Sequence, residues 1–225
     1  MTTAHKRKTT AAAWLPVAVT RGATLGAILG ATLGLSACSP TSNLFTHTAQ
    51  AAFESRLTEE QVVDAKIKTG ILDRMIGIDK MLALDLSVDV WKTRVMLTGT
   101  LSSTDLRNQV ARAVQYDARV SEFYNEVRII SEDEQATRRE WKEKAQSGAQ
   151  KAADSFEDFW IETKISAQLI GTKDINSVNY RWRSVLGTVY LLGEAGSARE
   201  LNAVVTIIKN TKGVKSLKTY APVRG

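Results

Sequence analysis

The pattern of hydrophobic and polar positions in residues 57–130 predicts a small mixed domain. Apolar residues recur at helical spacing over 62–72. They then alternate with polar residues over 86–98, which is typical of two strands with one buried face. A second amphipathic stripe follows Ser103, a good helix N-cap, and a last apolar stretch covers 124–130. The predicted order of elements is α-β-β-α-β.

The same pattern returns in the second half of the chain, which indicates an internal duplication. Residues 94–99 resemble residues 188–193 at an offset of 94, and this offset continues through the second amphipathic stripe. Residues 64–72 resemble residues 162–170 at an offset of 98. We therefore expect the second copy to lack about four residues after its first helix.

These patterns predict an α+β fold with two tandem small domains. Each would be an α-β-β-α-β sandwich, a three-stranded sheet with two helices on one face and solvent on the other. The first domain is expected at 57–130 and the second at 154–225. Residues 131–153 carry five acids and five bases and are predicted to form a charged, helical connector.

The first 37 residues are typical of a secretory signal. Basic residues come first, acidic residues are absent, and an apolar run follows over 23–35. That run has roughly 13 residues, whereas a transmembrane helix needs about 20. The run ends at Leu35-Ser36-Ala37-Cys38, which resembles the lipobox of bacterial lipoproteins.

The lipobox resemblance implies that Cys38 is lipidated on sulfur after cleavage of residues 1–37. A chance or buried cysteine is the alternative. Residues 38–56 would then form a polar tether to the folded body. Ser39 follows the cysteine where a signal for retention at the inner membrane usually has aspartate, which favours the outer membrane, facing the periplasm.

Charge and side-chain chemistry narrow the function. The net charge of +6 falls to +2 without the signal, so nucleic acid is not an expected partner. The only histidines are His5 and His47, and Cys38 is the only cysteine. Neither metal-ligand spacing nor a phosphate-binding glycine loop is present. We expect no enzyme activity, catalytic residue, metal or cofactor.

Several short motifs resemble the BON domain, a small module of bacterial envelope proteins. In the first copy they are Lys66-Ile67, Val95-Met-Leu97-Thr-Gly99 and Val120, although Arg119 replaces the usual glycine. In the second copy they are Lys164-Ile165, Val189-Tyr-Leu191-Leu-Gly193 and Gly213-Val214. A lipobox with two such copies resembles the dual-BON outer-membrane lipoproteins, over nearly all of residues 57–223.

This resemblance implies that the first helix of the second domain binds anionic phospholipid. The residues that it singles out are Trp160, Ile165, Ser166, Gln168 and Ile170. Tryptophan suits a membrane interface, and the second copy carries a charge of +3 against −1 for the first. Core packing is the alternative for Ile165. Gly99 and Gly193 are interpreted as structural glycines at strand ends.

The predicted function is therefore that of a lipid-anchored, periplasm-facing protein that supports outer-membrane integrity or stress tolerance. Its predicted partners are the membrane, through the acyl anchor and anionic phospholipid, and an envelope protein. The alternative function is a protein-interaction scaffold in an envelope or secretion assembly.

Overall fold

A computed structural model describes residues 54–146 and 157–225, and these residues fall within one compact unit. The predicted signal sequence, Cys38, nearly all of the tether and the end of the connector lie outside the described residues.

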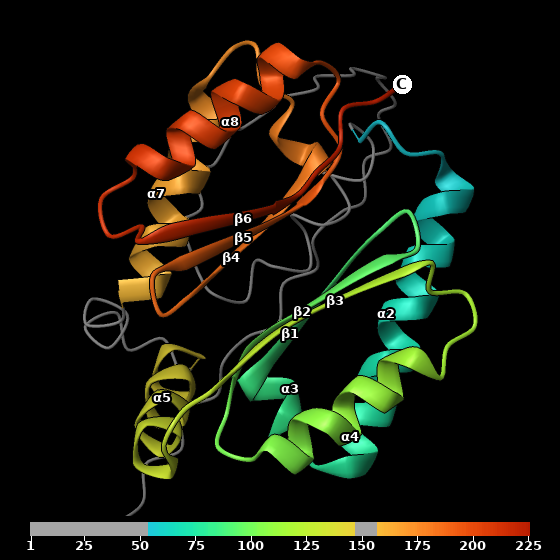
Figure 1. Ribbon diagram of the computed structural model, residues 1–225, viewed down its shortest axis with the longest axis vertical. Coiled ribbons are helices and arrows are strands. Elements are labelled where there is room, and N and C mark those ends of the chain that lie inside the picture. The colour runs from blue at the N-terminus through green and yellow to red at the C-terminus, as the bar shows by residue number, and fades with distance from the viewer. Residues whose placement is uncertain (1–53, 147–156) are drawn as a thin grey trace, which may run out of the picture. The chain divides into compact units, whose positions relative to one another are not determined.

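The first module contains three helices and one sheet (Figure 1). In chain order they are α2 (Thr58–Ile78), α3 (Leu82–Asp85), β1 (Leu86–Trp91), β2 (Arg94–Leu101), α4 (Thr104–Gln115) and β3 (Glu122–Ile129). Strand β2 lies in the middle of the sheet, antiparallel to β1 and parallel to β3. The short helix α3 adds one element to the predicted α-β-β-α-β order.

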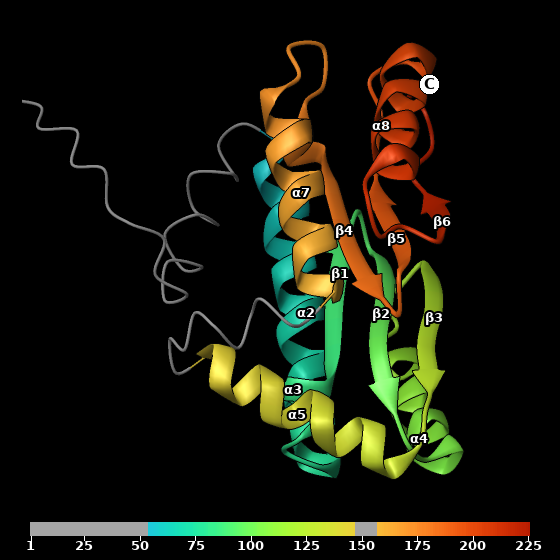
Figure 2. The same ribbon diagram turned by 90° about the vertical axis from the view of Figure 1, so that its left-hand side faces the viewer.

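The second module repeats this arrangement. It contains α7 (Glu157–Gly171), a 3-10 turn (Ser177–Asn179), β4 (Tyr180–Val185), β5 (Thr188–Gly193), α8 (Ala198–Asn210) and β6 (Ser216–Tyr220). Strand β5 is central, antiparallel to β4 and parallel to β6. The fold is thus α+β with two three-stranded sheets. Helix α5 (Glu132–Gln146) follows the first module and contacts α3 and β2 (Figure 2).

Each module has its own core between the sheet and its two long helices. In the first module, apolar residues of α2 and α4 pack on those of β1 and β2. In the second, residues of α7 and α8 pack on those of β4 and β5. The hydroxyls of Ser103 and Ser197 cap α4 and α8 by accepting hydrogen bonds from Leu106 N at 3.2 Å and Glu200 N at 3.1 Å.

The two modules correspond at a constant offset of 94 residues, including the first helix. The buried stripe of α2 is Asp64, Ile67, Ile71 and Met75, and that of α7 is Asp158, Ile161, Ile165 and Leu169. The predicted offset of 98 in this helix was wrong by one helical turn, as was the predicted loss of four residues. Positions 94 residues apart are called equivalent below.

The predicted exposure of the second sheet face was also wrong. The faces turned away from the helices pack on one another, so that helices cover the far side of each sheet (Figure 1). An apolar cluster fills this interface: Trp91, Met96, Val185, Tyr190 and Leu192. Arg94 on β2 crosses to the second module and donates hydrogen bonds to the carbonyls of Gly193 at 2.7 Å and Tyr220 at 2.8 Å.

Residues 54–56 form a strap across both modules. The Glu54 carboxylate pairs with Arg181 of the second module, and Arg56 pairs with Asp64 of the first. Glu54 also pairs with Arg56 within the strap. The end of the predicted tether is therefore fixed at the junction of the modules.

Candidate membrane-contact surface and the adjoining pocket

Helix α7 has one buried and one exposed face. Ile161, Ile165 and Leu169 belong to the core. Around the other side, Phe159 is 46% exposed, Trp160 is 36% exposed and Ile170 is 67% exposed. A helix packed on a small domain ordinarily presents polar residues to water, so large apolar side chains here make a candidate contact surface. We call Phe159, Trp160 and Ile170 the apolar surface of α7.

The residues predicted from the BON resemblance divide between the two faces. Trp160 and Ile170 lie on the apolar surface, and Ser166 is half-buried beside it. Ile165 has no exposed area, because it sits in the middle of the buried stripe. Ile165 is therefore a core residue, as the alternative interpretation held, and it does not belong to the predicted contact residues. Gln168 is exposed, but its amide holds α7 to the end of α8.

The side-chain amide of Gln168 makes two hydrogen bonds within the protein. Its Nε2 donates to Thr211 Oγ1 at 2.9 Å and to the Lys164 carbonyl at 3.1 Å. Both partners are protein atoms, so in this structure the amide connects two helices. Its role here is structural.

The chemistry of the surface is that of a membrane interface. The Phe159 and Trp160 rings meet edge to face, with centroids 5.9 Å apart. Lys164 and Lys173 are exposed on or just after the same helix. Aromatic residues with nearby lysines are the side chains that favour an anionic headgroup region.

The equivalent helix of the first module lacks this combination. The residue equivalent to Trp160 is the exposed Lys66, and the one equivalent to Phe159 is Ala65. Ile76, which is equivalent to Ile170, is 44% exposed. Aromatic residues at these exposed positions thus distinguish the second module, and Ile76 offers a matched comparison for Ile170.

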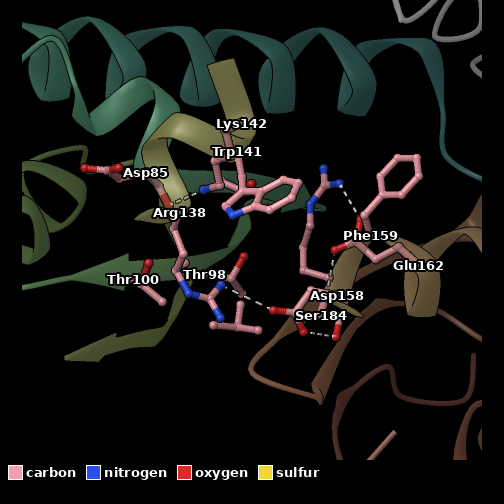
Figure 3. Close-up of a pocket in the computed structure, with 14 residues that line it drawn as sticks. Asp85, Thr98, Thr100, Arg138, Trp141, Lys142, Asp158, Phe159, Glu162 and Ser184 are labelled. Carbon is pink, nitrogen blue, oxygen red and sulfur yellow. Dashed lines mark hydrogen bonds and ion pairs between the residues drawn. The ribbon is translucent and has the colours of Figure 1, made fainter. Parts of the chain in front are cut away.

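A pocket of about 230 Å³ adjoins this surface. It lies where β1, β2, α5, α7 and β4 meet, and Figure 3 shows Trp141 of α5 and Phe159 of α7 among the side chains that line it. Because Phe159 both lines the pocket and is partly exposed, the pocket borders the apolar surface of α7.

The charged groups around the pocket hold its walls together. Arg138 of α5 lies 3.4 Å from Asp158 of α7. Lys142 donates to the carbonyls of Leu84 at 2.8 Å and Asp85 at 3.1 Å, at the end of α3. Burial lowers the pKa of Lys142, although the Asp85 charge opposes that effect. These contacts connect the connector helix to both modules.

Sequence reasoning missed two equivalent aspartates that organise the hairpins. Asp64 accepts hydrogen bonds from the backbone N–H groups of Lys92 and Thr93, each at 2.8 Å. Asp158 accepts from the N–H groups of Leu186 and Gly187, each at 2.9 Å. The turn residues have positive φ angles, as in the tight turns that join antiparallel strands. The signal was present in the 94-residue spacing of the two aspartates.

Across 54–146 and 157–225, every helix is too short or too polar to cross a bilayer. Within these residues, no group of histidine, cysteine, aspartate and glutamate side chains is arranged to hold a metal ion.

Comparisons with known proteins give a domain and a relative. Residues 157–220 match the sequence model of the BON domain. A protein of Anaplasma centrale, described as an uncharacterized protein in the gshII 5′ region, is 34% identical over 139 residues, which cover 62% of this chain and 82% of that protein.

Two solved structures also show similarity, both of CdsD, a structural protein of the type III secretion system of Chlamydia trachomatis. One is 12% identical and covers 68% of this chain and 92% of its own, with a TM-score of 0.27. The other, the C-terminal domain, is 11% identical and covers 66% and 96%, with a TM-score of 0.28.

Proposed function

Because this chain belongs to the family of the Anaplasma centrale protein and has a BON domain at residues 157–220, we propose that it is an envelope protein that binds anionic phospholipid through its second module. A BON domain suggests an envelope or phospholipid role without catalysis. The observation that carries the proposal is the apolar surface of α7, where two aromatic rings and Ile170 are exposed beside lysines.

The physical case rests on the position of these side chains. Trp160 can place its ring among acyl chains and headgroups while its indole N–H keeps a polar partner. Each neighbouring lysine adds up to about 1 kcal/mol of attraction to an anionic surface. The buried stripe of α7 stays in the core, so binding requires no unfolding of the helix.

The lipid anchor at Cys38 completes the proposal. Acylation there would hold the chain on the outer membrane, facing the periplasm, and the contact through α7 would be a second attachment. Tethering raises the effective concentration of the second contact, so a weak and selective interaction becomes sufficient. The role in outer-membrane integrity is part of the same proposal and comes from the BON resemblance.

Vesicle binding tests the contact surface. In residues 38–225 with Cys38→Ser, which carry neither the predicted signal nor the acyl anchor, we expect Trp160→Glu or Ile170→Glu to weaken binding to phosphatidylglycerol vesicles about ten-fold or more. Losing the burial of one large apolar side chain is worth at least that factor. Co-sedimentation with vesicles measures the change.

Ile76→Glu is the matched control, since it introduces the same charge at the equivalent exposed position of the first module. It should change vesicle binding by less than about two-fold, because this position lies outside the proposed contact surface. Equal binding to phosphatidylglycerol and phosphatidylcholine, or equal losses in the control, would count against a lipid-binding surface and favour the protein-scaffold alternative.

Metabolic labelling tests the anchor separately. Cells that express the unaltered chain should incorporate labelled palmitate into it, and Cys38→Ser should abolish the label, because the thiol is the acceptor. Cys38→Ala serves as a second variant with the same expectation. Label that persists in both variants, or that never enters the unaltered chain, would disprove acylation at Cys38.

A further inference from the structure

The interface between the two sheets pairs equivalent positions of the two modules. Arg183 on β4 donates from Nε to Asp89 Oδ2 at 2.8 Å and from Nη2 to Asp89 Oδ1 at 2.9 Å. Asp89 lies on β1, is 3% exposed, and is equivalent to Arg183. A residue of one module therefore meets its own counterpart across the interface, with the opposite charge.

A second equivalent pair repeats the reversal. Lys68 on α2 and Glu162 on α7 are equivalent and carry opposite charges. Glu162 lies 3.8 Å from Arg183, within the same module. Lys68 is half-buried and interacts electrostatically with Asp89. At these two equivalent positions the first module carries a base and an acid, and the second carries an acid and a base.

The ionisation of these groups reflects their mutual influence. Burial raises the pKa of Asp89, but the charge and hydrogen bonds of Arg183 outweigh it, so the pKa lies below its usual value. Burial raises the pKa of Glu162, with Arg183 acting in the opposite direction. Burial lowers the pKa of Lys68, and the Asp89 charge opposes it.

Apolar contact by itself would not make this interface selective. The hydrophobic effect is non-directional. The apolar cluster between the sheets would therefore also pack on any other apolar sheet of matching shape; its residues are Trp91, Met96, Val185, Tyr190 and Leu192. If two copies of the first module packed face to face in the same way, Asp89 of one would meet Asp89 of the other. Two copies of the second module would likewise bring Arg183 against Arg183. Buried like charges oppose such pairings, which is how proteins reject wrong partners.

We propose that the charge reversal makes each sheet face selective for the face of the other module, so that it rejects a copy of its own kind. The partner that fits the Asp89 face is a module with arginine at the equivalent position, and the chain supplies that partner itself. Two like faces from separate copies would instead bring equal charges together. This inference stands independently of lipid binding.

Distance measurements in the full-length Cys38→Ser chain test the proposal. Spin labels on cysteines introduced at the exposed positions Gln109 of α4 and Asn202 of α8 report whether the modules are closed on one another. The doubly labelled chain without further substitutions should give one narrow distribution of distances between the two labels. Asp89→Arg and Arg183→Asp should each broaden it, and the double variant Asp89→Arg/Arg183→Asp should narrow it again.

The matched control is Arg199→Asp, which changes an exposed arginine of the same module away from the interface and should leave the distribution narrow. Should a single variant fail to fold, recovery of a folded, closed chain in the double variant still tests the pairing. Single variants that stay closed, or a double variant no better than the singles, would overturn the proposal.

Mixing the two single variants gives a second test. The Asp89→Arg chain has two basic faces and the Arg183→Asp chain has two acidic faces. Each alone should sediment as a monomer, and an equimolar mixture should form a complex of twice the mass. A mixture that remains monomeric, or self-association of either variant alone, would contradict selectivity by charge reversal.

Discussion

Replacing Gly193 by alanine is expected to destabilise the second module by about 3–5 kcal/mol. Gly193 ends β5 with a φ of +153°, where an added Cβ would lie 2.2 Å from the carbonyl oxygen of Asn179 and 3.0 Å from the Tyr180 Cα. Both obstacles are backbone atoms, one at the start of β4 and one in the 3-10 turn just before it, so neither can move aside independently. Either the β4–β5 ladder separates locally or the strand end changes conformation. Urea unfolding of the Cys38→Ser chain measures the loss.

The equivalent Gly99→Ala should behave in the same way, because its Cβ would lie 2.3 Å from the Asp85 carbonyl at a φ of +131°. Gly171→Ala is the control. It ends α7, an added Cβ there has no atom within 4 Å, and the change should stay within about 1 kcal/mol. If Gly193→Ala and Gly171→Ala unfolded at similar urea concentrations, the close approach of backbone at Gly193 would not explain why glycine is needed there.

Replacing Asp158 by alanine should cost about 3–4 kcal/mol of stability. The carboxylate is 4% exposed and accepts from the Ser184 hydroxyl at 2.7 Å as well as from the two turn N–H groups. Arg138 of the connector helix also lies 3.4 Å away. Removal leaves these donors buried with fewer acceptors, and the strained β4–β5 turn loses its support. Chemical denaturation followed by tryptophan fluorescence measures the change.

Asp174→Ala supplies the comparison, since this aspartate is exposed in the loop after α7. It should change stability by less than about 0.5 kcal/mol. The equivalent Asp64→Ala should resemble Asp158→Ala, because Asp64 supports the β1–β2 turn and pairs with Arg56 of the strap. A small loss for Asp158→Ala, similar to that for Asp174→Ala, would contradict a structural role for the buried carboxylate.

The order and type of the long elements could be predicted because their signals are local. Val88 and Val90 alternate with polar residues, and this pattern is visible within a few neighbouring positions. The same is true of the stripe of Val110 and Val114 that follows the Ser103 cap. The end glycines were also recognisable, because a glycine at a strand end often marks a close approach of backbone. The atoms that crowd Gly193 come from Asn179 and Tyr180, at and just before the start of the paired strand, and this proximity arises only in the fold.

The register of the first helix could not be predicted because an apolar stripe nearly repeats after one turn. A slip of four residues still places Ile on Ile, at 67 and 165, and so preserves the apparent match. The correct offset places Asp64 on Asp158, and what fixes it is the contact of each carboxylate with its own hairpin turn. A sequence comparison weighted toward apolar positions overlooks a buried acid of this kind.

The candidate site was predictable only in part. Trp160 and Ile170 were identified and are exposed, whereas Ile165 was identified and is buried, because motif resemblance does not state which face of a helix is free. The closed interface between the sheets had no local signal. Arg183 is separated from Asp89 by 94 positions, and an alternating strand looks the same whether its polar face meets water or another charged sheet.

The strap joins parts of the chain that are synthesised far apart in time. Ser55 donates a backbone hydrogen bond to Asn179 Oδ1 at 2.9 Å, across 124 positions of sequence. During synthesis, the strap emerges before either module, yet its partner in the second module emerges late. The first module can therefore form its local contacts early, including the pair of Arg56 with Asp64, whereas the contacts of the strap with the second module form later. Until the second module forms, Glu54 lacks Arg181 and the Ser55 N–H lacks the Asn179 side chain.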